Sequence, residues 1–236
     1  MKTMSLVLLP GLDGTGELFD PLITHLPKWI NPIVVKYPED KPYGYSELKP
    51  IVIRKLPENS DFVIIGESFS GPLAVMTAGD RPKGLQGIIL CASFISKPFR
   101  FVPSWLSIFS VSPVYKLWPA AIRLRTIVGR KNYRQLAVKA LDAIKSVGPD
   151  VIAARVKAIL KVNVEEELGR CDVPILYMAG GKDHLIKKHN IDSIKKIKRD
   201  MKVSEIGTQH LILQLEPKIA AEEIEKFLKS IQQKTG

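Results

Sequence analysis

The chain has 236 residues, 45% of them hydrophobic and 25% charged, a length that suits one domain with a small insertion and a composition that excludes disorder. Its two cysteines, Cys91 and Cys171, stand in neither a metal-ligand nor a redox spacing, which excludes a disulfide framework and predicts a reducing, cytoplasmic compartment. No run approaches the roughly 20 apolar residues of a membrane-spanning helix, while the net charge of +11 raises the question of an acidic partner.

Short β-rich runs alternate with helical patterns along most of the chain, which is typical of a parallel sheet covered by helices. Five of the runs are nearly continuous apolar stretches, as expected for strands that are buried on both faces. The expected strands are Ser5–Leu9, Pro32–Tyr37, Asp61–Gly66, Leu85–Ala92, Val173–Ala179 and the shorter Lys202–Ile206. The expected helices are Glu17–Leu26, Tyr45–Lys55, Ser68–Gly79, His189–Lys195 and Pro217–Gln232.

A glycine-rich turn, Pro10–Gly16, directly follows the first expected strand. It matches neither the P-loop nor the dinucleotide-binding fingerprint, which disfavours a phosphate site. Acyl transfer needs two backbone N–H groups aimed at the developing oxyanion. A turn after a neighbouring strand can supply one of them, and Leu12 is the natural donor here.

The strongest local motif is Gly66-Glu67-Ser68-Phe69-Ser70-Gly71, between an apolar strand and a helical run. A nucleophile on such a strained strand-to-helix turn needs small residues two places before and two places after it. Gly66 and Ser70 fill those places, although the common G-x-S-x-G pattern has glycine at the second of them. The motif predicts Ser68 as nucleophile and the N–H of Phe69 as the second oxyanion donor.

The alternation breaks between residues 96 and 161. Four prolines and several aromatic residues precede two expected helices, within Tyr133–Leu160, that are separated near Gly148-Pro149. We interpret 96–161 as a helical lid inserted into a core formed by residues 1–95 and 162–236. The aromatic residues of the lid can line an acyl pocket, or they can form the insertion's own core. The candidates for substrate contact are Trp105, Phe109, Tyr115 and Trp118.

The same segment carries 13 Lys and Arg against 2 Asp and Glu, which accounts for the whole net charge of the chain. A basic run is usually a solvated face, but this confinement favours an acidic partner. None of the usual nucleic-acid-binding motifs accompanies it, so a nucleic-acid partner is not expected. The candidates for contact with an acidic partner are Arg123, Arg125, Arg130, Lys131, Arg134 and Arg155.

Two further loops follow the fifth and sixth expected strands, and they end in Asp183 and His210. Catalytic groups gather at the carboxyl edge of open α/β sheets, so both are expected to lie near Ser68. The chain order Ser, Asp, His is the one that α/β-hydrolases use. We therefore expect His210 to be the base and Asp183 to be the acid that orients it.

Alternatives at these motifs stay open. G-x-S-x-S can be a chance turn, and Ser70 as nucleophile would place Pro72 at a position of the turn that proline suits badly. His184 adjoins Asp183, but adjacent side chains diverge, which disfavours His184 as the base.

On these motifs the chain resembles the α/β-hydrolases, and especially small bacterial members with an L-P-G-L-D-G-T-G opening and a G-E-S-F-S-G elbow. The resemblance covers nearly the whole chain and is weakest in the insertion. It implies the α/β-hydrolase fold, with about six mainly parallel strands, flanking helices and a helical lid. It also implies the roles given above to Ser68, Asp183 and His210 and to the donors Leu12 and Phe69. Many members have His-Gly where this chain has Pro10-Gly11, and we expect this chain to lack the leading antiparallel hairpin of the family.

The resulting expectation is a serine carboxylesterase that forms an acyl-enzyme and needs neither a cofactor nor a metal. Its acidic partner could be an acyl carrier protein that presents an acyl ester, an anionic membrane surface, or a small anionic ester. The chain is similar to esterases that cleave the methyl ester of pimeloyl-carrier protein in biotin biosynthesis, which makes the first the sharpest hypothesis. The alternatives are a lipase or thioesterase at an anionic surface and a catalytically silent binding module.

Overall fold

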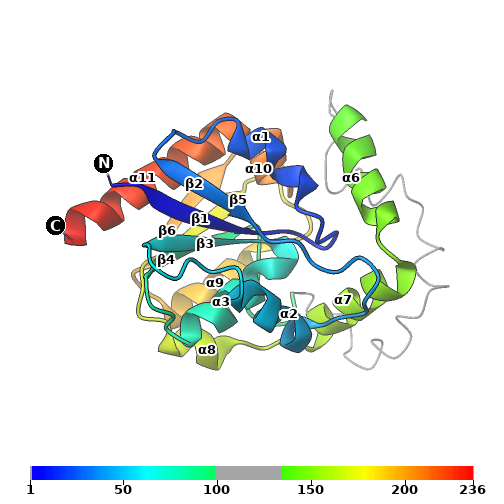
Figure 1. Ribbon diagram of the computed structural model, residues 1–236. Coiled ribbons are helices and arrows are strands. Elements are labelled where there is room, and N and C mark those ends of the chain that lie inside the picture. The colour runs from blue at the N-terminus through cyan, green and yellow to red at the C-terminus, as the bar shows by residue number, and fades with distance from the viewer. Residues whose placement is uncertain (1, 99–133, 236) are drawn as a thin grey trace.

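The computed structural model describes residues 2–98 and 134–235, without the side chains of 134, 135, 137, 234 and 235. In this part of the chain six strands form one sheet, and all of its pairings are parallel. The strands are β1 (Met4–Leu9), β2 (Ile30–Val34), β3 (Phe62–Glu67), β4 (Leu85–Cys91), β5 (Ile175–Gly180) and β6 (Lys202–Ile206). Their order across the sheet is β2-β1-β3-β4-β5-β6 (Figure 1). The predicted six-stranded parallel sheet is confirmed.

Strand β2 lies earlier in the sequence than expected. Its predicted last residue, Tyr37, has already left the ladder, because its N–H donates to Gly14 O of the turn after β1 at 2.8 Å. The apolar run therefore continues past the strand and serves to hold that turn.

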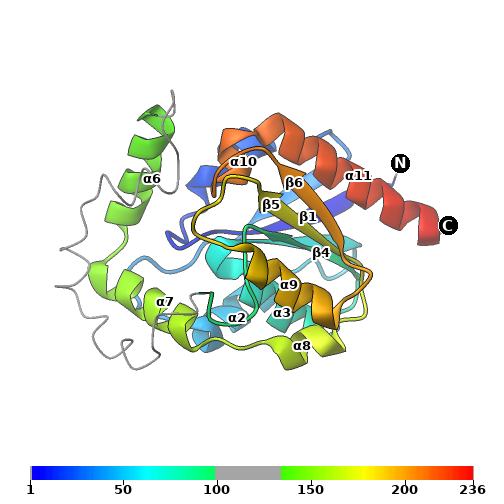
Figure 2. The ribbon, with the colours of Figure 1, turned by 180° about the vertical axis from the view of Figure 1, so that it is seen from behind.

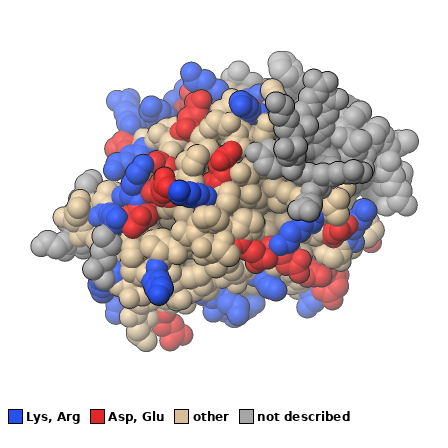
Figure 3. Space-filling model, turned by 90° about the horizontal axis from the view of Figure 1, so that it is seen from above, with Lys and Arg blue, Asp and Glu red and all other residues tan. Residues whose placement is uncertain are grey.

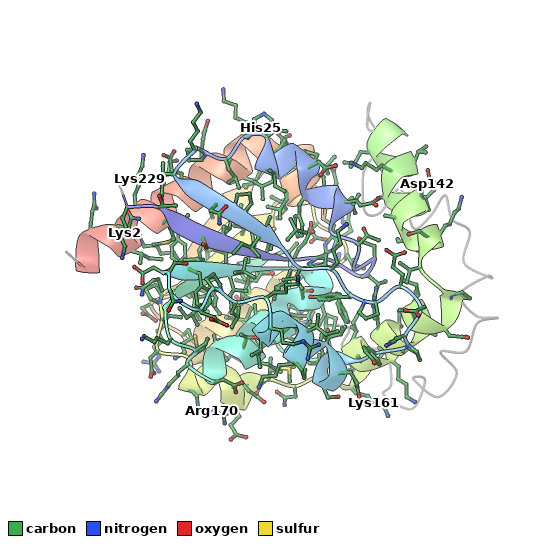
Figure 4. All side chains as sticks on the ribbon, viewed as in Figure 1. Lys2, His25, Asp142, Lys161, Arg170 and Lys229 are labelled. Carbon is green, nitrogen blue, oxygen red and sulfur yellow. The ribbon has the colours of Figure 1, made fainter. Side chains whose placement is uncertain are left out.

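Side chains on alternate residues of each strand face opposite sides of the sheet, and each side has its own core. In β1, Val7 and Leu9 belong to one core, and Leu6 and Leu8 belong to the other. The first core is covered by α2 (Tyr45–Ile53), α3 (Gly71–Gly79), α8 (Glu165–Arg170) and α9 (Lys188–Ile197). The second is covered by α1 (Asp20–Ile23), α10 (Ile212–Leu215) and α11 (Pro217–Thr235). Figures 1 and 2 show these two helical layers from opposite sides, and Figure 4 shows side chains filling the space between them and the sheet.

Strand order reverses between β1 and β3, because β2 lies on one side of β1 and the later strands lie on the other. Ligands bind outside the carboxyl ends of the strands at such a switch point. Leu9 at the end of β1 is level with Gly66 in β3. The turn Pro10–Gly16 and the residue Ser68 therefore leave the sheet side by side.

The chain leaves and re-enters the core through one narrow neck. Val164 N–H donates to Ile95 O at 2.8 Å, and Lys97 N–H donates to Val162 O at 3.1 Å. Between these points lie α6 (Arg134–Ser146) and α7 (Pro149–Lys161), separated near Gly148 as expected. Helix α6 packs against η1 (Glu17–Phe19), which follows the turn after β1.

Outside residues 96–161, the surface of the molecule carries both basic and acidic side chains. Over the described part of the face in Figure 3, Lys and Arg side chains are interspersed with Asp and Glu. Among the described helices, none combines the length and the apolar character that crossing a bilayer requires. The charge excess thus belongs to 96–161 rather than to the sheet and its covering helices.

Candidate active site

Ser68 sits on a sharp turn between β3 and α3, with a short 3-10 helix, η2 (Ser68–Ser70), between them. Its φ of 48° is in the left-handed region, which a non-glycine residue rarely adopts. A Cβ at Gly66 would lie 2.6 Å from Ser70 O, so no side chain is tolerated two places before the serine. This is the strained elbow that the motif predicts.

The structure brings the three predicted triad residues together. His210 Nε2 lies 2.8 Å from Ser68 Oγ, and His210 Nδ1 lies 2.8 Å from Asp183 Oδ2. Because a carboxylate can only accept, the imidazole proton belongs on Nδ1, which leaves Nε2 free to accept from the serine hydroxyl. The side chains of His210 and Asp183 are both buried. The arrangement provides a short path for the Ser68 proton.

Asp183 is held as a carboxylate by several donors. Its Oδ1 accepts from the N–H groups of Leu185 at 2.7 Å and Ile186 at 3.0 Å, while its Oδ2 faces His210. Burial alone would raise the pKa of Asp183, but the hydrogen bonds from His210 and these two amides and the charge of His210 outweigh it and lower the pKa below its ordinary value. The orienting group is therefore ionised at neutral pH.

The loops that carry Asp183 and His210 are bonded to each other. Lys182 N–H donates to Thr208 O at 2.8 Å, and Gly181 N–H donates to Ile206 O at 2.7 Å. A Cβ at Gly180 would lie 2.5 Å from Gln209 O, so this close approach requires glycine. The spacing between acid and base is thus set by backbone contacts.

The peptide that links Ser68 to Phe69 is fixed from the carbonyl side. Ser93 Oγ donates to Ser68 O at 2.6 Å. In a trans peptide the C=O and N–H point in opposite directions, so this bond also orients Phe69 N–H. The Phe69 ring stacks on Tyr45 at 4.8 Å, and Tyr45 Oη donates to Phe69 O at 2.9 Å. Both sides of the predicted oxyanion donor are therefore anchored.

The turn that carries Leu12 is anchored in the same way. Gly14 N–H donates to Gly11 O at 3.1 Å, which fixes the peptide whose other end is Leu12 N–H. Asp13 is buried, and its Oδ2 accepts from Thr15 N–H at 3.0 Å and from Thr15 Oγ1 at 2.7 Å. The two predicted donors, Leu12 and Phe69, thus lie on adjacent, well-bonded loops at the switch point.

Ser70, the departure from the common elbow pattern, is completely buried. Its hydroxyl donates to Pro10 O and lies 2.6 Å from Tyr37 Oη. The serine thereby ties the elbow to the turn after β1, and it is not placed to act as a nucleophile. After the nucleophile, a side chain is excluded at residue 71 rather than at residue 70, because a Cβ at Gly71 would overlap Ser93 Oγ.

The prediction that Arg155 contacts an acidic partner is wrong. Arg155 is fully buried, and its guanidinium donates to three backbone carbonyl oxygens inside the protein, Leu12 O, Asp13 O and Pro38 O. A group bound in this way cannot receive an acidic partner. The signal that would have identified it is its place in α7, four residues after Val151 and on the same apolar face.

The remaining candidates of the insertion fall outside the described side chains. Arg134 begins α6, but its side chain is not among those that the structure describes. The other candidates outside the described residues are Trp105, Phe109, Tyr115, Trp118, Arg123, Arg125, Arg130 and Lys131.

Sequence reasoning assigned no role to Glu67, the residue before the nucleophile. It is buried, and Gln214 Nε2 donates to its Oε1 at 2.9 Å. Burial raises the pKa of Glu67 to about 7, against the lowering effect of the Gln214 hydrogen bond. A second titratable carboxyl therefore lies next to the proton path.

Within the residues that the structure describes, no three His, Cys, Asp or Glu side chains cluster as a metal site would require.

Comparison with known proteins bears on the fold. No family model matches the sequence, and no curated protein matches it. An esterase from Exiguobacterium antarcticum has a TM-score of 0.83 at 14% identity, over 97% of this chain and 92% of that one. An enol-lactonase from Burkholderia xenovorans has a TM-score of 0.81 at 15% identity, over 97% and 92%. A lipase-esterase related protein from Clostridium acetobutylicum has a TM-score of 0.78 at 16% identity, over 96% and 95%. At such identities a shared fold follows, and activity has to be argued from the site.

Proposed function

The chain has the α/β-hydrolase fold, and from this premise we propose that it is a serine hydrolase that cleaves carboxylic esters through an acyl-enzyme on Ser68. One observation carries the proposal: His210 lies 2.8 Å from both the Ser68 hydroxyl and the Asp183 carboxylate, at the switch point of the sheet. A serine, an imidazole and a carboxylate in this order form the arrangement that activates a hydroxyl for acyl transfer.

The proposed reaction begins with attack of Ser68 Oγ on the ester carbonyl carbon, while His210 Nε2 takes the hydroxyl proton. Asp183 stabilises the imidazolium that forms, and the N–H groups of Leu12 and Phe69 stabilise the oxyanion. Collapse of the tetrahedral intermediate breaks the ester C–O bond, and His210 returns the proton to the leaving alcohol. Water then attacks the acyl-enzyme with His210 as base, which releases the carboxylic acid and restores Ser68.

The insertion is proposed to be a lid that selects the substrate. The neck formed by residues 95–97 and 162–164 supports one continuous insertion, and α7 contacts the turn that carries Leu12. The excess of basic residues in 96–161 favours an acyl group carried by an acidic partner. In its sharpest form the proposal is hydrolysis of the methyl ester of pimeloyl-acyl carrier protein in the cytoplasm.

The class of reaction is tested with a fluorophosphonate probe and p-nitrophenyl acetate. The wild-type protein is expected to be labelled on Ser68 and to hydrolyse the ester. Ser68→Ala should abolish labelling, and Asp183→Asn should lower kcat by about 10⁴-fold, since the wrong imidazole tautomer then faces the serine. A wild-type protein that is neither labelled nor active on any ester of a panel would instead be a silent binding module.

A further inference from the structure

Among the residues that the structure describes, no carboxylate oxygen is bonded to the buried guanidinium of Arg155. Its Nη1 donates to Leu12 O at 2.8 Å and Asp13 O at 2.7 Å, and its Nη2 donates to Pro38 O at 2.9 Å. The guanidinium also lies over the Tyr37 ring, 5.6 Å from its centre. Burying a charge is costly even when most of its donors are satisfied, and here the Nε of Arg155 has no hydrogen-bond partner among the described residues. An arginine whose guanidinium donates to three main-chain oxygens therefore indicates that the position of that main chain matters.

The three carbonyls belong to two segments that already contact each other. Leu12 and Asp13 lie in the turn after β1, and Pro38 follows Tyr37, whose N–H donates to Gly14 O in the same turn at 2.8 Å. Arg155 joins both segments to α7. The Leu12 side chain also packs against the apolar cluster of Val147, Val151 and Ile152, of which Val151 and Ile152 belong to α7.

The turn is shaped to receive the guanidinium. Gly14 has φ +72°, and a Cβ there would lie 2.6 Å from Arg155 Nη1. Glycine is thus required both by the backbone conformation and by the approach of the arginine. A turn with glycine at residues 11, 14 and 16 has wide conformational freedom on its own. The bond from Gly14 N–H to Gly11 O fixes one of its peptides, and Arg155 fixes the next two.

We propose that Arg155 is a positioning residue of the oxyanion hole and that it holds Leu12 N–H toward the reacting carbonyl. The hole is then complete only while α7 packs against the turn after β1. This inference rests on the proposed serine hydrolase activity. Arg155 does not touch the substrate. It acts by removing the freedom of the Leu12–Asp13 and Asp13–Gly14 peptides.

The test compares Arg155→Met and Arg155→Lys with Lys157→Met, an exposed position on the same helix. The acylation rate constant and KM for p-nitrophenyl acetate are measured, together with the inhibition constant of a trifluoromethyl ketone, which forms an oxyanion adduct with the serine. Loss of one oxyanion donor lowers turnover by about 10² to 10³-fold. The acylation rate constant of Arg155→Met should fall by about 10²-fold at nearly constant KM, and its inhibition constant for the ketone should rise by the same factor.

Arg155→Lys keeps the charge but has no planar fork, so it should recover part of the loss. It also keeps the test decisive should Arg155→Met not fold. Lys157→Met should behave as wild type. Folded Arg155 variants with wild-type acylation and ketone affinity, or with a raised KM alone, would overturn the inference. If the wild-type protein is inactive, or if Ser68→Ala retains activity, the proposed function has failed instead.

Discussion

At the scale of single residues, Glu67 is a buried carboxyl whose titration should be visible in the stability of the protein. Burial raises its pKa from 4.5 to about 7 in the folded chain. Between pH 4.5 and 7 the unfolded chain therefore releases a proton that the folded chain keeps. The free energy of unfolding should fall as the pH rises through this window and should lose nothing further from this group above it. At about 1.4 kcal/mol per pKa unit, the full loss is about 3 kcal/mol.

Glu67→Gln should remove this dependence and stabilise the protein at pH 8. Among the described residues Gln214 Oε1 has no hydrogen-bond partner, and the new amide can donate to it. Urea denaturation at pH 5 and pH 8 measures the effect, and Glu58→Gln, at an exposed position, is the matched control. If the free energy of unfolding changed equally between pH 5 and pH 8 for the wild type and for Glu67→Gln, the raised pKa of Glu67 would be contradicted.

Residue-level patterns pointed to the three triad candidates because Ser68 and Asp183 follow apolar strands, and His210 follows the shorter and more polar strand β6. Arg155 was misassigned because charge alone does not say which way a side chain points. Its spacing from Val151 carried the correct signal, which the basic composition of 96–161 obscured. Glu67 and Gln214 are 147 residues apart, and no local pattern connects a pair that only the fold brings together.

At the scale of secondary-structure elements, the junction of β3 and α3 depends on one glycine more than the motif suggests. Gly71 packs directly on Ser93, whose hydroxyl holds the Ser68 carbonyl. Gly71→Ala should displace Ser93 and loosen the Ser68–Phe69 peptide. We expect a loss of about 1–3 kcal/mol of stability from overpacking, with kcat falling by at least tenfold.

The matched control is Gly169→Ala in α8, where a Cβ meets nothing within 4 Å. In a helix this change should be neutral or stabilising by up to about 1 kcal/mol. Thermal unfolding and kcat on p-nitrophenyl acetate separate the two variants. Equal behaviour of Gly71→Ala and Gly169→Ala would show that the contact with Ser93 is not needed.

The strands and the long helix α11 were predictable, whereas the shortest helices were not. Most strands are apolar runs and α11 shows helical spacing, while β2 shifted because its continuation bonds to the turn at Gly14. Helices α8 and α10 have 6 and 4 residues, too few for helical spacing to appear. Tertiary packing decides them: Leu168 of α8 belongs to one core, and Ile212 of α10 belongs to the other.

At the scale of the whole molecule, charge is divided unevenly between the insertion and the rest. Residues 96–161 hold the entire excess of +11, whereas outside them basic and acidic residues balance. Electrostatic attraction between a basic segment and an acidic carrier is screened as salt shortens the Debye length from about 10 Å at 0.1 M to about 3 Å at 1 M. A neutral ester feels no such attraction, so the two substrate classes should respond differently to salt.

Raising NaCl from about 0.05 M to 0.5 M should lower kcat/KM for an acyl ester on an acyl carrier protein at least tenfold, because encounter is no longer steered. The value for p-nitrophenyl acetate should change less than about twofold over the same range, since that ester carries no charge to be screened. Reversing the charges of Arg130, Lys131 and Arg134 to Glu should reproduce the loss at low salt. Changing the exposed Lys28, Lys55 and Lys83, which lie outside residues 96–161, to Glu alters the net charge equally. This second triple variant should lose much less kcat/KM for the carrier-bound ester. Equal losses from both triple variants would mean that net charge, rather than the insertion, recruits the carrier.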